Sequence, residues 1–435
     1  MGIEAYKIDE YINRVCSHVK YKKAHNEIKE ELFDHLQEKI EGLMENGIIE
    51  EEAVKESILQ MGDAEIIGKQ LNESHKAVPE ISIILLTVVL SLIGLLSIYF
   101  IATRGIDLNI DRVYRTIFYN VLGCCIMTAL YFFNYKTLER YSKIIYTIIS
   151  LILFFQCIVC PEINGTKRWI NLGFLSMDIT EMSLFLYAIT LPKMLQDLEW
   201  DSIKHIAYLF FIAFIPLGLY VLLNTMMCLI IYLVLFITLM ILVKAKLRYI
   251  LIMIFTVLGG TITFIASREY HIKRLMVFLH PESDPNGAGY INSQISLVLK
   301  SVGLYGHGLN SPPRTIPEIQ NDFVLTYIIY AFGWIGGIVV ISLAFIFIIR
   351  LFMAAKKIRD SFGSLVIQGF LCIFALKFIW NILMILGFMP IVSVSLPFIS
   401  YGGSGLVVQM AAVGLILSIY KAKNLSNTSS ISIKS

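Results

Sequence analysis

The sequence predicts an all-α polytopic membrane protein with ten transmembrane helices and a small soluble helical domain at its N-terminus. Of the 435 residues, 57% are hydrophobic and only 16% are charged, which is too little polar surface for a soluble globular protein. Ten apolar stretches approach the length of about 20 residues that a helix needs to cross the hydrocarbon layer. An acidic segment with helical periodicity precedes all of them.

The acidic segment is expected to be a cytoplasmic domain, residues 1–78. Residues 1–79 contain 10 Lys/Arg against 17 Asp/Glu, a net charge of −7, whereas the rest of the chain carries +10. Apolar residues spaced by three and four from Ile28 to Leu43 predict an amphipathic helix. Shorter helices are predicted at 53–61 and, after Gly62 and Asp63, at 66–71. The first residues lack the apolar core of a secretory signal.

The membrane domain is expected to span residues 79–423. Its predicted spans are 81–101, 116–133, 143–160, 178–195, 205–223, 225–243, 248–267, 323–350, 363–389 and 402–420. The fourth span is the weakest of these because Asp178 and Glu181 lie at its start. A polar tail, 424–435, follows the last span and is expected to be disordered.

Charge in the short connecting segments predicts the orientation. With the N-terminus inside, the short cytoplasmic segments hold 14 Lys/Arg and the short outer segments hold five, as the positive-inside rule requires. Ten crossings return the C-terminus to the cytoplasm. The outer loop 268–322 is unusually long and therefore a candidate for function. Within it, Ile295–Val302 has the pattern of a short amphipathic helix lying on the membrane.

The seven cysteines give no metal site. Cys157 and Cys160 form a CxxC pattern, but no second ligand pair follows nearby. Most of the others lie inside apolar runs, where a cysteine behaves as a small hydrophobic residue. No metal site is therefore predicted, and no feature of the chain indicates nucleic-acid binding.

The first candidate site is residues 165–181. Lys167 and Arg168 place two positive charges beside Trp169, and such a pair can hold a pyrophosphate. The alternative is an aromatic belt with snorkelling cations. Glu181 is either a substrate contact or an ordinary acidic residue in the first turn of a helix, where the helix dipole favours it.

The second candidate site is the long outer loop and its end. Asp322 stands where the eighth span begins, so it is either the N-cap of that helix or a general base at the water–lipid boundary. In the second case partial desolvation and nearby Glu318 would raise its proton affinity. Lys273 and Arg274 add positive charge to the loop, either toward a substrate or as solvated surface.

The third candidate site is residues 387–405, where prolines and glycines interrupt the apolar sequence around Tyr401 and Ser404. Broken backbone at membrane depth is tolerated where it is buried in protein or lines a wet cavity; the alternative is a simple tight connection. Lys377, with Asn381 one turn further on, lies near the middle of the ninth span. A lysine at that depth should face the protein interior or a cavity.

These motifs, in this order, resemble the SEDS family, the FtsW/RodA/SpoVE proteins. The stretches that carry the resemblance are KRWINLG, RLMVFLHPESDPNGAGY, VGLYGHGLN, IPEIQNDFVLTYIIYAFGWIGG and PFISYGGSGLVVQMAAVGLILSI. It covers roughly residues 81–420. Residues 27–71, EIKEELFDHLQEKIEGLMENGIIEEEAVKESILQMGDAEIIGKQL, resemble a second module, the small HAAS helical domain, which implies a regulatory or docking role.

The resemblance implies a peptidoglycan glycosyltransferase that polymerises lipid II at the outer membrane face and pairs with a class B penicillin-binding protein. It implies that Asp322 is the essential aspartate, that Arg168, Trp169, Glu181 and Glu318 match further motif positions, and that lipid tails lie between helices. A divalent cation at the pyrophosphate is compatible with this chemistry, although no dedicated ligand cluster is visible. The role, in elongation, division or sporulation, is left open.

The chain also departs from the family pattern. Leu184 replaces a usual lysine, Tyr330 and Ala331 replace two acidic residues, and Lys377 replaces a usual glutamine. These departures keep two other hypotheses open. One is a non-catalytic scaffold, and the other is a transporter of a lipid-linked precursor, which Lys377 and the broken segment near Pro397 would favour.

Overall fold

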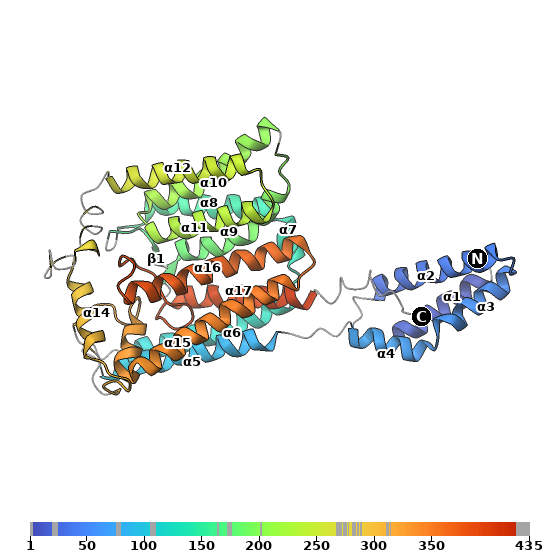
Figure 1. Ribbon diagram of the computed structural model, residues 1–435, viewed down its shortest axis with the longest axis horizontal. Coiled ribbons are helices and arrows are strands. Elements are labelled where there is room, and N and C mark those ends of the chain that lie inside the picture. Colours follow the sequence, from blue (N-terminus) through green and yellow to red (C-terminus); the bar gives the residue numbers. More distant parts are fainter. Residues whose placement is uncertain are drawn as a thin grey trace. The chain divides into compact units, whose positions relative to one another are not determined.

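A computed structural model gives the fold of the protein (Figure 1). The structure describes residues 3–19, 25–74, 80–104, 110–162, 165–171, 176–200, 202–266, 272, 276, 278–280, 284, 287, 289–309, 313 and 315–422. The chain divides into two compact units, Met1–Pro79 with Ile419–Ser435, and Glu80–Ser418.

Four helices form the first unit: α1 (Ile3–Ser17), α2 (His25–Glu45), α3 (Glu50–Met61) and α4 (Ala64–Ser74). They bury two apolar clusters, one around Val15, Ile28 and Leu36 and one around Ala53 and Val54. Gly62, with φ 94°, ends α3, as the sequence predicted. This domain can bury a core of its own because its apolar residues recur at helical spacing.

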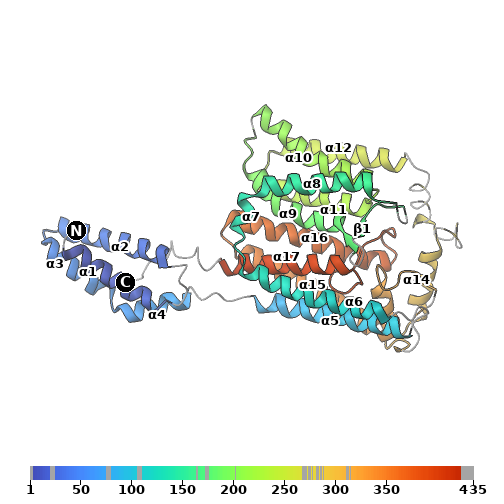
Figure 2. The same cartoon turned by 180° about the vertical axis from the view of Figure 1, so that it is seen from behind.

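The second unit is a bundle of long apolar helices (Figures 1 and 2). Its helices are α5 (Ile81–Arg104), α6 (Ile110–Phe132), α7 (Lys136–Arg140), α8 (Ser142–Val159), α9 (Ile179–Gln196), α10 (Ile203–Leu222), α11 (Met226–Leu242), α12 (Leu247–Ala266), α14 (Tyr290–Ser301), α15 (Val324–Lys356), α16 (Ser361–Ile385) and α17 (Gly403–Ala422). Each predicted span coincides with one of these helices.

Seven helices of the described part are long and apolar enough to cross a membrane: α5, α6, α8, α10, α15, α16 and α17. The chain is thus an all-α polytopic membrane protein. Of the other predicted spans, α11 is apolar but only 17 residues long. Helix α9 begins with the acidic residues that made its prediction weakest.

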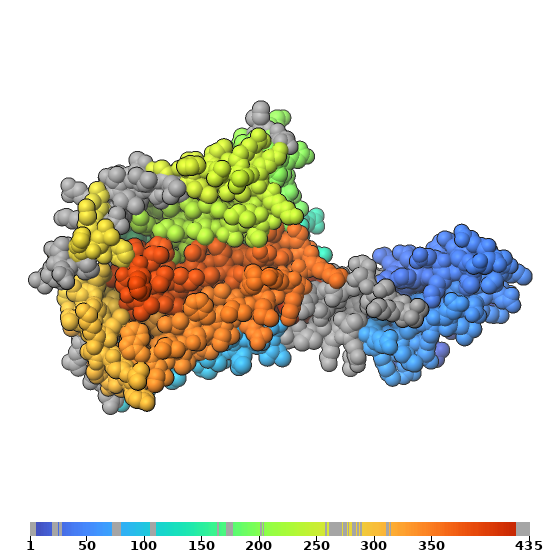
Figure 3. Space-filling model, in the orientation of Figure 1, coloured from blue at the N-terminus to red at the C-terminus, as the bar shows by residue number. Residues whose placement is uncertain are grey.

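A helix, α14, and a short β-hairpin lie at one end of the bundle. Helix α14 runs across that end, and its residues cover the end in the space-filling view (Figure 3). It begins before the amphipathic helix predicted at 295–302 and ends at Ser301. A short antiparallel hairpin, β1 (Trp169–Asn171) with β2 (Ser176–Asp178), lies at the same end, and Trp169 pairs with Asp178.

Aromatic packing fixes the non-helical segment between α16 and α17. Phe398, with φ 64°, stacks on Phe374 with ring centroids 5.4 Å apart and meets Phe347 edge-on at 5.3 Å. All three rings are at least 97% buried. The segment is therefore held between α15 and α16 rather than forming a loose connection, which favours the prediction of buried broken backbone.

Candidate functional site

Arg168 and Asp178 form an ion pair beside the β-hairpin. The register of the hairpin sets Asp178 opposite Trp169, so Arg168 precedes β1 where Asp178 ends β2. Nε and Nη2 of Arg168 donate to Oδ2 of Asp178 at 3.1 and 2.6 Å. Only 16% of the Arg168 side chain is exposed. Charge-assisted bonds of this kind are about twice as strong as neutral ones.

Asp178 also begins helix α9. Its Oδ1 accepts from the backbone N–H of Glu181 at 3.1 Å and from the hydroxyl of Thr180 at 2.5 Å. One carboxylate thus caps the helix and binds Arg168. The backbone N–H of Asp178 in turn donates to Oγ of Ser404 at 2.9 Å, which joins the hairpin to the start of α17.

Glu181 forms a buried ion pair with Lys377. The ammonium group of Lys377, on α16, donates to Oε1 of Glu181. Nε2 of Gln409, on α17, donates to the same oxygen at 2.9 Å. Glu181 and Lys377 are 7% and 4% exposed. This pairing identifies the partner of the intramembrane lysine and shows that Glu181 joins three helices.

Asp322 lies near these pairs, in the turn before α15. It is partly buried, and its carboxylate accepts a hydrogen bond from Ser393. The same serine accepts from Nη1 of Arg168 at 3.1 Å. Ser393 therefore links the carboxylate to the Arg168 guanidinium.

The surroundings of Asp322 change its proton affinity. Burial raises the pKa of Asp322 above its ordinary value, because the charged form loses hydration. Glu318 raises that pKa as well, whereas Arg168 and the hydrogen bond from Ser393 lower it in part. A carboxylate with a raised pKa is the kind of group that accepts a proton in general-base catalysis.

The backbone around Asp322 is also fixed. Nδ2 of Asn381 donates to the carbonyl of Asp322 at 2.9 Å and to that of Val394 at 2.8 Å. The N–H of Tyr401 donates to the carbonyl of Gln320 at 2.9 Å. Asn381 and the segment before α17 therefore hold the turn that carries Asp322.

The alternative that Asp322 is a helix cap is wrong. The N-cap residue of α15 is Phe323, and it makes no side-chain capping bond. The helix starts without a cap because Val324 and the residues after it are packed in the protein core, so tertiary contacts rather than capping hold its first turn.

Several other predicted site residues take no part in the ion pairs Arg168–Asp178 and Glu181–Lys377. Nζ of Lys167 donates to the carbonyl of Cys157 at 3.0 Å, so it does not pair with Arg168 around one anion. Glu318, at φ 54°, accepts from the side chain of Asn321. Trp169 is partly exposed. Lys273 and Arg274 lie outside the described residues.

Three groups of the cluster were not predicted as site residues: Asp178, Ser393 and Gln409. Asp178 lies within the first candidate stretch, 165–181, but on sequence grounds it stands out only as a weakness in the prediction of the fourth span. Its position three residues before Glu181 at a helix start is a capping signal. Ser393 lies within the third candidate stretch, 387–405, but neither it nor Gln409 stood out individually, because a single hydroxyl or amide in an apolar run is uninformative without the fold.

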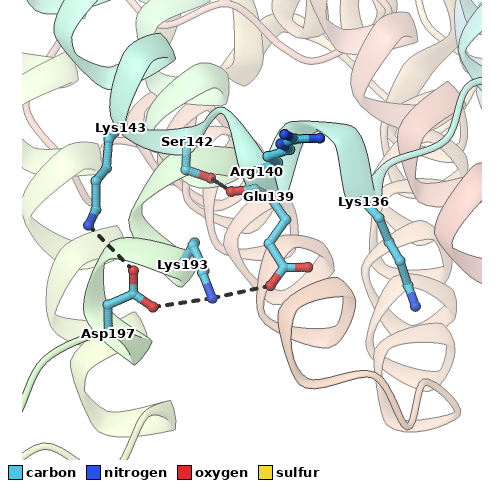
Figure 4. A pocket seen from close by; sticks show the side chains of 7 residues that line it. All are labelled: Lys136, Glu139, Arg140, Ser142, Lys143, Lys193 and Asp197. Atoms are coloured by element: carbon cyan, nitrogen blue, oxygen red, sulfur yellow. Dashed lines mark hydrogen bonds and ion pairs between the residues drawn. The ribbon is translucent and has the colours of Figure 1, made fainter.

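A hollow elsewhere in the bundle has a different character. Its cavity volume is about 370 Å³, and it is lined by residues of α7, α8 and α9: Lys136, Glu139, Arg140, Ser142, Lys143, Lys193 and Asp197 (Figure 4). Lys193 pairs with both Glu139 and Asp197, at 3.4 and 3.2 Å. It lies at the end of the bundle opposite α14 (Figure 2) and contains no predicted site residue.

Within the described residues, no group of three or more His, Cys, Asp or Glu side chains gathers as metal ligands do. Cys157 and Cys160 are free thiols.

Two known proteins are similar to this chain over most of its length. The stage V sporulation protein E of Bacillus subtilis (strain 168) is 26% identical over 369 residues, covering 80% of this chain and 98% of that protein. The peptidoglycan glycosyltransferase MrdB of Escherichia coli (strain K12) is 27% identical over 333 residues, covering 74% and 89%.

Solved structures share the fold. A chain from a study of the structural coordination of polymerization and crosslinking by a peptidoglycan synthase complex matches with a TM-score of 0.67 at 21% identity, covering 79% of this chain and 98% of that one. The rod shape determining protein RodA of Thermus thermophilus matches with a TM-score of 0.60 at 20% identity, covering 79% and 97%.

A family profile decides the assignment. The profile FTSW_RODA_SPOVE, described as "Cell cycle protein", matches residues 79–425. This range covers the membrane unit and every residue of the cluster described above. The chain therefore belongs to the FtsW/RodA/SpoVE family of cell cycle proteins.

Proposed function

We propose that this protein is a peptidoglycan glycosyltransferase that polymerises lipid II, with Asp322 as the general base. The observation that carries the proposal is a partly buried carboxylate with a raised pKa, linked through Ser393 to Arg168. Two relatives whose sequences align with most of this chain are named peptidoglycan glycosyltransferases. The family assignment and the site geometry therefore support the same activity.

The chemistry requires a base and a place for a departing anion. A sugar hydroxyl attacks an anomeric carbon, and a new C–O bond forms while the bond to the undecaprenyl pyrophosphate oxygen breaks. Asp322 takes the hydroxyl proton, and the pyrophosphate leaves with the bonding electron pair. Attack opposite the leaving group inverts the anomeric carbon.

Arg168 serves this chemistry by its charge. Its Nε and Nη2 are engaged by Asp178, so it is not free to grip a pyrophosphate with its whole guanidinium group. Its Nη1 side, at Ser393, faces the region of Asp322. There it keeps the carboxylate ionised and favours an anion developing nearby.

The membrane arrangement follows from the same proposal. Ten crossings place both termini in the cytoplasm and the Asp322 end of the bundle outside, as the loop charges favour. The lipid tails lie along the helices, and a class B penicillin-binding protein is the partner. Residues 1–78 act as a docking or regulatory domain on the cytoplasmic side.

The test is glycan polymerisation by the purified protein in proteoliposomes containing lipid II. We expect polymer from the wild type and a loss of at least about 100-fold for Asp322→Asn, which keeps the shape but cannot accept the proton. Glu162→Gln, which neutralises an exposed carboxylate outside the proposed machinery, is the matched control. Undiminished polymer from Asp322→Asn would refute the role of this carboxylate.

The buried pair Glu181–Lys377 at membrane depth favours a second candidate, translocation of the lipid-linked precursor. The same proteoliposomes distinguish the two functions. Movement of labelled lipid II across the bilayer without polymer would favour a transporter. Neither movement nor polymer, with or without the partner protein, would favour a scaffold.

A further inference from the structure

Helix α15 is broken at Gly333. A continuous helix of 33 residues would be about 50 Å long, well beyond the hydrocarbon thickness of about 30 Å. Gly333 has φ 76° and ψ −175°, so it interrupts the helix and separates residues 324–332 from 334–356. The shorter part begins two residues after Asp322, at Val324.

A segment after α14 binds the broken backbone. We call residues 303–308 the strap. The N–H groups of His307 and Gly308 donate to the carbonyls of Tyr330 and Ala331 at 2.8 and 3.0 Å. These carbonyls lose helical partners at the break, and unpaired polar groups at membrane depth are costly.

The strap also accepts from the far side of the break. The N–H of Trp334 donates to the carbonyl of Gly303 at 3.3 Å, and that of Ile335 to Leu304 at 3.4 Å. The strap therefore bonds to both parts of α15 and substitutes for the missing helical bonds. Because it contacts both parts, it can fix the angle between them.

Two glycines allow this contact. Gly306 and Gly333 both have positive φ, 71° and 76°, a region that other residues adopt at a cost. A Cβ at Gly306 would lie 2.7 Å from the carbonyl of Ala331, and one at Gly333 would collide with the carbonyl of Leu304. Any side chain at either position would force the strap away from α15.

His307 connects the strap to α14. Its Nε2 lies 3.1 Å from the carbonyl of Ser301, the last residue of α14, and its ring packs on Tyr330 with centroids 4.7 Å apart. Helix α14 itself packs against α15 and crosses the end of the bundle (Figure 1). The strap thus joins α14 to the part of α15 that follows Asp322.

We propose that the strap is a positioning device for Asp322, an inference that rests on the proposed function. Asn381 fixes the carbonyl of Asp322 from α16, and the strap fixes residues 324–332 from the other end. Between these anchors the carboxylate is held beside Ser393 and Arg168. Loosening the strap lets the short helix tilt and moves the base from its working position.

The test uses Gly333→Ala and Gly306→Ala. We expect kcat for polymerisation to fall by about 10- to 100-fold, because small misplacements of a catalytic group cost this much. KM for lipid II should stay within about twofold. Gly303→Ala is the matched control in the strap, since Gly303 lacks positive φ and a Cβ there would meet nothing within 4 Å.

Two further controls separate positioning from folding. Gly47→Ala places comparable backbone strain, φ 87° with nothing within 4 Å of an added Cβ, outside every candidate site and should leave kcat unchanged. His307→Pro removes the N–H that binds Tyr330, whereas His307→Ala keeps it. If the glycine variants do not fold, a larger loss of kcat in His307→Pro than in His307→Ala still supports the proposal, and equal values overturn it.

Hydrogen exchange supplies a readout that does not depend on activity. Gly333→Ala should speed exchange at 320–323 and 330–335, and Gly303→Ala should not. An inactive wild type would refute the proposed function, while the exchange result would still decide whether the strap holds Asp322. Unchanged exchange at 320–323, or fast exchange with normal kcat, would overturn the positioning role.

Discussion

Glu181 and Lys377 depend on each other because both are buried in an apolar bundle. Lys377→Met would leave the Glu181 carboxylate without its ammonium partner and should cost about 3–5 kcal/mol of stability. The double variant Glu181→Leu, Lys377→Met removes both charges and should cost clearly less. Thermal unfolding of the purified proteins measures both, and additive losses would contradict a coupled pair.

Protonation of Asp322 is expected to set the acid limb of the pH profile of kcat/KM. Burial raises its pKa, so it takes up a proton at a higher pH than an ordinary aspartate does. A general base must be ionised, and kcat/KM should therefore be full above this raised pKa and fall as the pH drops through it. A profile measured with wild-type protein checks this, and an acid limb at or below the ordinary aspartate pKa would contradict it.

At the level of residues, the sequence identified much of the cluster but not its contacts. Arg168, Glu181, Asp322, Lys377 and Asn381 were candidate residues, and the structure brings them together; their roles remain predictions. The contact between Glu181 and Lys377 joins residues 196 apart. It depends on how two helices are rotated, which residue types do not reveal. Lys167 was expected beside Arg168 but turns to a backbone carbonyl.

Asp178 both caps helix α9 and binds Arg168. A pair of substitutions can separate these two roles. Asp178→Asn keeps a capping oxygen but removes the charge beside Arg168, whereas Asp178→Ala removes both. We expect Asp178→Ala to be less stable than Asp178→Asn by about 1 kcal/mol, the usual value of a cap. Denaturation of both variants checks this, and equal stability would mean that the cap contributes little.

At the level of elements, apolar length predicted the helices well, because a span is defined by one strong property, its hydrophobicity. The ends were less certain: α15 continues to Lys356, beyond the predicted 350. The β-hairpin was missed, since strands of three residues are too short to show alternation. The break at Gly333 was missed as well, because a single glycine in an apolar helix is common in membrane spans.

Across the whole molecule, the two units have separate cores, so each should fold by itself. Removing residues 1–79 should leave the thermal transition of the membrane unit within a few degrees of the full chain. In the full chain, Leu36→Ala should destabilise only the small domain, by about 2–5 kcal/mol, because Leu36 is fully buried there. Aggregation of the shortened protein in detergent would contradict this independence.

The net charge changes near Pro79, where the first stretch of one compact unit ends; an acidic amphipathic segment and an apolar one need different solvents, and the domain assignment stays a prediction. The sequence also predicted the family, through motifs whose order is specific. The orientation in the membrane still rests on loop charges alone. The angles between helices could not be predicted, because they depend on side-chain packing across the bundle.

The hydrogen bonding of the segment before α17 bears on which acceptor, a sugar hydroxyl or water, reacts with an activated sugar. Its amide groups find partners inside the protein: Phe398 donates to Oε1 of Gln409, and Leu396 to Oγ of Ser400, each at 2.8 Å. Backbone that is satisfied in this way needs no solvent. In the polymerase that we propose, this segment lies beside the Asp322 turn, where Tyr401 donates to the carbonyl of Gln320. A backbone that binds no water there favours transfer of the activated sugar to another sugar over hydrolysis.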